Sequence, residues 1–144
     1  MIEQDTIKLL RECDAGVKMG IASIDEVLGH VRSEILKQEL TACKNEHEAL
    51  ARQIQALLAR YADEGKEPNP IAQGMSWVKT NVTLTTNESD SAVAGLITDG
   101  CNMGVKSLSR YLNQYAAADE TSKDIAKALI RLEENLASSI RKFL

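Results

Sequence analysis

The sequence predicts an all-α protein that folds as an antiparallel four-helix bundle. Apolar residues make up 44% of the 144 residues and aromatic residues only 3%, so the core must consist mainly of Leu, Ile, Val and Ala, which suits helix-on-helix packing. Apolar residues recur at spacings of three and four over four long segments, as expected for one face of a helix. The only prolines are Pro68 and Pro70, so long helices are allowed on both sides of them. The chain length of 144 residues suits a single domain, residues 1–144.

The first helix is predicted from about Asp5 to Leu28, with Asp5 or Thr6 as its cap. Its apolar face consists of residues three or four apart, namely Leu10, Cys13, Val17, Ile21, Ile24 and Leu28. Gly29-His30 breaks this pattern, so we expect the helix to end there and His30 to lie in a loop.

The second helix has the most regular pattern. Ser33 is a plausible N-cap, with Glu34 in the first turn. Spacings of four and three then alternate along Leu36, Leu40, Cys43, His47, Leu50, Ile54, Leu57 and Tyr61. Such a seam is typical of helices that are buried in bundles. Asp63-Glu64-Gly65 marks its end.

The long connection between the two halves of the chain is predicted over residues 65–87. Asn69-Pro70 resembles a cap followed by proline at the first helical position. We therefore expect a short extra helix from Ile71 to about Thr85 inside this crossover.

The third long helix is predicted from near Glu88 to about Ala118, and a fourth follows a turn at Asp119 to Ser122. The third carries an apolar face of Val93, Ile97, Cys101, Gly104, Leu108, Tyr111 and Tyr115. The fourth carries Ile125, Leu129, Leu132, Leu136, Ile140 and Phe143. Four long helices, two short turns and one long crossover complete the layout.

The first and third helices share a local pattern, which suggests an internal duplication of helix pairs 5–64 and 88–143. Residues 13–18 read C-D-A-G-V-K and residues 101–106 read C-N-M-G-V-K. Glycine inside a helix costs up to about 1 kcal/mol relative to alanine. The matched Gly16 and Gly104 therefore predict a close approach of helices at mid-height.

Two helix pairs joined by a long crossover resemble the ferritin-like superfamily. The paired C-x-x-G pattern and Gly65-Lys66-Glu67-Pro68 are similar to a bacterial ferritin-like family of unknown function. Di-iron sites of this superfamily need single glutamates on two helices and Glu-x-x-His on the other two. The corresponding single positions are Val17 and Val105, no Glu-x-x-His occurs, and we expect no Asp or Glu on the inward stripes. The resemblance thus implies a scaffold without the superfamily's metal site.

An unusual metal site remains an alternative. Cys43 and His47 are four residues apart and so share a helix face, and Cys13 and Cys101 lie on the stripes of the first and third helices at matched heights. Such residues could hold a transition metal such as iron or zinc. The competing interpretation is that free cysteines are small buried hydrophobes and that His47 is a hydrogen-bonded core residue.

Other chemistry lacks support in the sequence. Nucleophilic catalysis by a Cys–His pair needs a third orienting group and an oxyanion site, and neither is visible. Glu133-Glu134 is predicted to be solvated surface. The net charge of -4 without a basic block disfavours nucleic acid, and no apolar run approaches the ~20 residues that span a membrane. The acidic N-terminus lacks a secretory pattern, so a cytoplasmic location is expected.

A stripe of small residues on the second helix suggests association. Ala42, Ala49 and Ala56 repeat every seven residues, with Ile35 in phase. Such a face could dock another helix closely, or could pack against the crossover. The sequence therefore predicts a non-catalytic bundle without a cofactor, which acts as a homo-oligomer or with a protein partner. The alternatives are the metal or redox protein described above and a small-molecule binder with an apolar cavity under Gly16 and Gly104.

Overall fold

A computed structural model describes residues 2–66 and 89–144, and confirms the predicted all-α four-helix bundle. The helices are α1 (Ile2–Leu28), α2 (Glu34–Arg60), α4 (Asp90–Gln114) and α5 (Glu120–Ser139), and a 3-10 turn, η1 (Arg141–Phe143), follows α5. The predicted short helix from Ile71 to Thr85, and the crossover beyond Lys66, lie outside the described residues.

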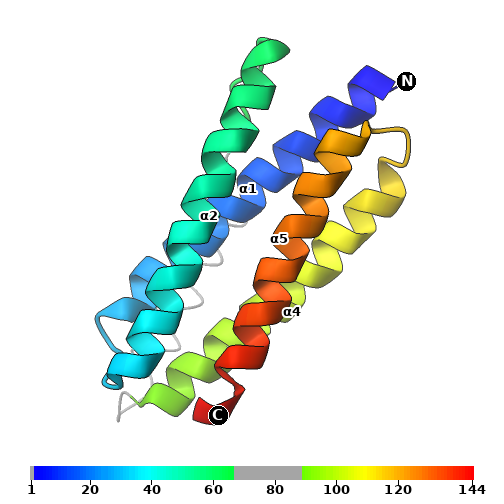
Figure 1. Cartoon of the computed structure of the whole chain (residues 1–144). Helices are drawn as coiled ribbons and strands as arrows, with labels where there is room; N and C mark the ends of the chain where they lie inside the picture. The colour runs from blue at the N-terminus through cyan, green and yellow to red at the C-terminus, as the bar shows by residue number, and fades with distance from the viewer. Residues whose placement is uncertain (1, 67–88) are drawn as a thin grey trace.

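The helices are arranged as two antiparallel pairs (Figure 1). α1 packs most extensively on α2, and α4 on α5. α1 also contacts both α4 and α5, whereas α2 and α4 have few contacts with each other. The bundle therefore has a short diagonal between α1 and α5 and a long diagonal between α2 and α4.

Three of the helix starts are capped as helix chemistry requires. The Ser33 hydroxyl accepts a hydrogen bond from the backbone N–H of Leu36, which confirms the predicted cap of α2. Ser89 accepts from the N–H of Ala92 at the start of α4. The Asp119 carboxylate accepts from the N–H of Ser122 at the start of α5.

Both short loops are fixed by a side chain from the other helix pair. The Asp90 carboxylate accepts hydrogen bonds from the backbone N–H groups of Arg32 and Ser33, at 2.8 and 3.0 Å. At the opposite end, Asp5 accepts from the N–H of Ala117 at 3.0 Å, and the Thr6 hydroxyl accepts from the N–H of Asp119 at 2.8 Å. The predicted capping role of Asp5 and Thr6 is wrong, because α1 already begins at Ile2 and their side chains bind the next loop instead.

These loop contacts explain a second difference. The sequence predicts a helix to about Ala118, but α4 ends at Gln114. The N–H groups of Ala117 and Asp119 bind Asp5 and Thr6 of α1, so residues 115–119 leave the helix in order to make this turn. His30 lies in the turn after α1, as predicted.

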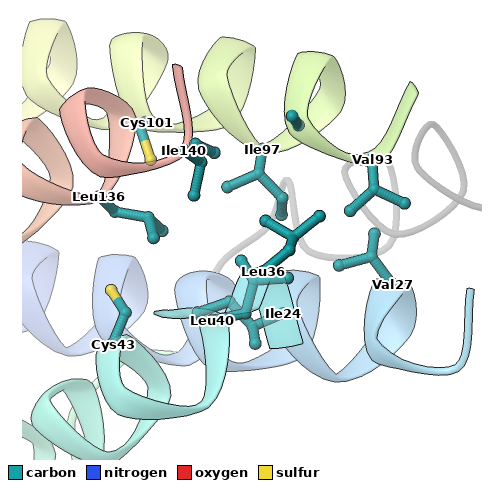
Figure 2. Packing of buried hydrophobic residues seen from close by; sticks show 11 residues of the cluster. Ile24, Val27, Leu36, Leu40, Cys43, Val93, Ile97, Cys101, Leu136 and Ile140 are labelled. Carbon is teal, nitrogen blue, oxygen red and sulfur yellow. The ribbon is translucent and has the colours of Figure 1, made fainter. Parts of the chain in front are cut away.

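The core consists of two clusters of buried residues. One cluster lies between the helices toward the end of the bundle that carries the 29–33 loop, and includes Ile24, Leu36, Leu40, Ile97 and Leu136 (Figure 2). The other lies toward the start of α1 and includes Leu9, Leu10, Val17, Ile54, Leu58, Leu108 and Leu129. The seam predicted for α2 is wrong in part: Leu50, Leu57 and Tyr61 are only half-buried, and Leu58 is fully buried in their place.

Candidate functional site

His47 lies in the interior of the bundle, on the buried face of α2, with 1% of its surface exposed. Its Nδ1 atom is 2.8 Å from the backbone carbonyl oxygen of Cys43, and its Nε2 atom is 3.0 Å from Oε1 of Glu133 in α5. A carbonyl oxygen only accepts hydrogen bonds, so Nδ1 carries a proton. With Nε2–H donating to the Glu133 carboxylate, the ring is an imidazolium in a buried ion pair.

The surroundings of His47 favour this charged form. Burial alone lowers the pKa of the imidazole, but hydrogen bonds to Cys43 and Glu133, together with electrostatic interactions with the same two residues, raise it to about 10. Opposite charge and hydrogen bonding to the charged form outweigh desolvation here. The imidazolium is therefore the state at neutral pH.

Glu133 is the partner that the sequence did not predict. Its side chain is 13% exposed and points to His47, so the expectations of a solvated Glu133 and of inward stripes without Asp or Glu are wrong. Space for the pair comes from Gly20 of α1, where an added Cβ atom would lie 2.8 Å from Nε2 of His47. At Gly104 of α4 an added Cβ atom would lie 3.5 Å from the Glu133 carboxyl carbon, which is ordinary van der Waals contact.

The structure does not show the tight approach predicted at Gly16 and Gly104. A Cβ atom at Gly16 would lie 3.5 Å from Leu129, which, like the 3.5 Å at Gly104, is ordinary van der Waals contact. The tight position is Gly20, which the repeated pattern does not include.

Two cysteines complete what we name the His47 cluster, which consists of Cys43, His47, Cys101 and Glu133. The Cys43 sulfur is 3.5 Å from Nδ1 of His47. The Cys101 thiol donates a hydrogen bond to the Glu133 carboxylate, and burial together with the charge of Glu133 raises the pKa of Cys101. Figure 2 shows the two sulfur atoms pointing toward each other from α2 and α4.

Cys13 lies apart from this cluster, contrary to the predicted matched heights of Cys13 and Cys101. It belongs to the other core cluster and is seven residues before Gly20, about 10 Å along α1. Burial, with a smaller effect of Glu12 and Asp14, raises the pKa of its thiol to about 12. Three of the four predicted metal ligands therefore come together, with Glu133 in place of Cys13.

The geometry of the His47 cluster is that of a hydrogen-bonded ion pair. Among residues 2–66 and 89–144, no group of three or more His, Cys, Asp or Glu side chains is placed to hold a metal ion. Glu133 does supply the third orienting group that sequence reasoning did not find for a Cys–His pair. Nevertheless Nδ1 of His47 is closer to the carbonyl oxygen than to the thiol, and Cys43 is only 6% exposed.

A second buried carboxylate, Asp14, lies in α1 with its side chain 1% exposed. It accepts hydrogen bonds from the Gln55 side chain at 2.7 Å and from the backbone N–H of Lys66 at 3.0 Å, and pairs with Lys18 at 2.9 Å. We name these four residues the Asp14 cluster. Gly65 has a φ of +90° and its α-carbon faces Asp14, so a side chain there would be strained and would collide with the carboxylate.

The outer face of α2 carries the small-residue stripe. Ala42 and Ala56 are exposed, Ala49 is half-buried and Ile35 is 55% exposed. Next to Ala56 a groove of about 460 Å³ runs between α2 and α5. Its apolar lining includes Leu50, Ala56, Leu57, Ile125 and Ala128. The half-buried leucines of the predicted seam therefore face this groove instead of the closed core.

Comparison of the chain with protein-family models, with curated proteins and with solved structures gives no match. None of the described helices is both long enough and apolar enough to cross a membrane.

Proposed function

We propose that this chain is a non-catalytic helical bundle that acts by associating with a protein surface, either another copy of itself or a different protein. The observation that carries the proposal is the outer face of α2. Four small or apolar residues at seven-residue spacing, Ile35, Ala42, Ala49 and Ala56, lie on the side of α2 away from the core. Residues of this size allow a second helix to approach closely.

The groove beside α2 supports the same function. Leu50 and Leu57 are half-buried and line it, so covering the groove would remove further apolar surface from water at roughly 25 cal/mol per Å². The buried His47 cluster fits a structural role in this proposal, because it fixes α2 to α5 and so holds the two walls of the groove in place.

We also propose that the chain has a ferritin-like scaffold of bacterial type without the superfamily's acidic metal site, and that the protein is cytoplasmic. These statements rest on the sequence patterns and on the arrangement of the helix pairs.

Site-specific cross-linking tests the association. A photo-reactive amino acid is placed at position 42 of the α2 stripe and, as a matched control, at position 110 of α4, where Arg110 is also exposed. We expect a cross-linked product from position 42 in the native cells, lost in an Ala49→Arg background, and none from position 110. Equal products from both positions, or none from position 42, would contradict the proposal.

The second candidate is a metal-binding or redox protein, favoured by the meeting of Cys43, His47 and Cys101 beside Glu133. A soft or borderline metal such as zinc or iron would have to displace one hydrogen bond of His47. Metal analysis of the purified protein tests this function. One metal ion per chain that is lost in Cys43→Ala and His47→Ala, but kept in Cys13→Ala, would replace the association proposal.

A further inference from the structure

The groove between α2 and α5 has the features of a surface that pairs with itself. We infer that a second copy of this chain docks on it, related to the first by a two-fold axis that runs along the groove. This inference rests on the association proposed above and specifies its partner. It is carried by the lining of the groove, by the extent of the surrounding face and by the arrangement of its charges.

The docking face extends along the whole of α2. Ala56 belongs both to the groove lining and to the α2 stripe. Residues seven apart lie on nearly the same side of a helix, so Ala49, Ala42 and Ile35 continue from the groove toward the start of α2. With a rise of 1.5 Å per residue, α2 is about 40 Å long and α5 about 30 Å long, and each helix is about 10 Å wide. The α2–α5 face therefore offers about 700 Å², close to the ~800 Å² that each partner buries in a standard-size interface.

Charged residues on this face alternate in sign. The charged residues Arg60 of α2 and Asp124 of α5 line the groove, and so does the neutral Gln53 of α2. Glu46 is seven residues before Gln53, and Arg131 is seven residues after Asp124, so both lie on the same side of their helices. From the middle of the bundle to the end with the groove, α2 thus presents the negative Glu46 and then the positive Arg60. Over the same distance α5 presents the positive Arg131 and then the negative Asp124.

A two-fold axis along the groove places α2 of one copy opposite α5 of the other at the same height. Because α2 and α5 meet at His47 and Glu133, heights can be counted from these two residues. Glu46 and Arg131 both lie within two residues of that level, less than about 5 Å apart along the axis.

The second charge pair lies further along the groove. Arg60 lies thirteen residues beyond His47, and Asp124 nine residues before Glu133, at about 20 Å and about 14 Å from the common level. The long arginine side chain can span this difference. Each α2–α5 contact in the dimer would therefore join Glu46 to Arg131 and Arg60 to Asp124.

These four side chains are available for such contacts. All four are exposed, and none of them takes part in an ion pair within the described portions of the chain, residues 2–66 and 89–144. An isologous interface needs a patch that is complementary to itself, and this arrangement of signs meets the requirement. A reversed order of signs on either helix would place like charges opposite each other.

Sedimentation velocity over a wide concentration range, with the full chain, tests the inference. The wild type is compared with Glu46→Arg, with Arg131→Glu, with the double swap and with Arg110→Glu as a matched charge reversal on α4. We expect a dimer whose Kd rises by about tenfold or more in each single variant, since two symmetric pairs become repulsive. The double swap should restore the wild-type Kd, and Arg110→Glu should leave it unchanged. Circular dichroism melting curves verify that each variant folds.

Two results would overturn the inference. One is a wild-type chain that stays monomeric at every concentration, and the other is a dimer that neither single reversal weakens. Neither result by itself contradicts the broader association, which is decided by the cross-link from position 42. A cross-linked product of a different mass than two chains, together with a monomeric wild type, would identify a different protein as the partner.

Discussion

Asp14 and Glu133 are both acidic residues inside the bundle, but their partners differ. Asp14 binds Gln55, Lys18 and the backbone N–H of Lys66, and all of these groups belong to the first helix pair or to the segment directly after it. Glu133 binds His47 of the opposite pair. The Asp14 cluster therefore fastens the end of α2 to α1, whereas the His47 cluster sets how one helix pair lies against the other.

The two sites also differ in how charge is balanced. The Asp14 carboxylate receives one cation and two neutral donors, a set that leaves no oxygen unsatisfied. The Glu133 carboxylate depends mainly on a single cation, His47, with the weak thiol donor of Cys101 beside it. Breaking a buried charge pair on one side leaves the other charge uncompensated, so the His47 cluster should be the more sensitive of the two.

Glu133→Ala should have the largest effect. It leaves His47 without its partner in the core, and we expect the free energy of unfolding to fall by about 3–5 kcal/mol. Chemical denaturation measures this loss. The control is the double variant His47→Leu with Glu133→Leu, which removes both charges and should recover most of the stability. A loss below about 1 kcal/mol, as for a surface pair, would show that the two charges are not buried together.

Alkaline pH should weaken the same contact without a mutation. The pKa of His47 is raised from 6.5 to about 10 in the folded state, so its contribution to stability is complete below pH 6.5 and is lost as the pH rises to about 10. The slope is at most about 1.4 kcal/mol per pH unit. The stability of the wild type relative to His47→Gln, measured by denaturation from pH 6 to 10, should decrease accordingly. A difference that stays constant with pH would exclude the imidazolium.

Asp14→Ala should have a smaller and more local effect. It removes the acceptor of Gln55 and Lys66, and we expect a loss of about 1–3 kcal/mol. Hydrogen exchange should become faster at the end of α2, near residues 55–66, and remain slow around His47. Exchange that rises equally in both regions would show that the two clusters are not separable.

Glycine substitutions should have the smallest effects and opposite signs. An added Cβ at Gly20 would meet His47 at 2.8 Å, so Gly20→Ala should cost about 1–3 kcal/mol through overpacking. At Gly100 no atom lies within 4 Å of the added Cβ, so Gly100→Ala should raise stability by up to about 1 kcal/mol. Thermal denaturation of the two variants measures the difference. Equal shifts would mean that His47 moves aside without cost.

Sequence reasoning found the helices because their periodicity is long and regular. It placed His47 on the buried face of α2 and named Cys43 and Cys101 beside it, and the structure brings these three together. The sequence also contained a signal for Glu133. His47 and Glu133 each lie fourteen residues after the N-caps of their helices, Ser33 and Asp119. Because these two helices begin at opposite ends of the bundle (Figure 1), both residues lie near its middle. Read on its own, Glu133 was one charged residue beside an apolar stripe.

The sequence by itself determined the four helices, the cap at Ser33 and the apolar composition of the core, because these depend on neighbours within a few turns. Only the tertiary structure decided which flanking residues became interior. Glu133 is buried because it contacts His47, for which Gly20 of α1 leaves room, and Asp14 is buried because the chain returns to α1 at Lys66. Leu50 and Leu57 face a groove because α2 and α5 pack less closely than either does within its own pair. Periodicity defines a face, but the distance and rotation between helices decide how much of that face is covered.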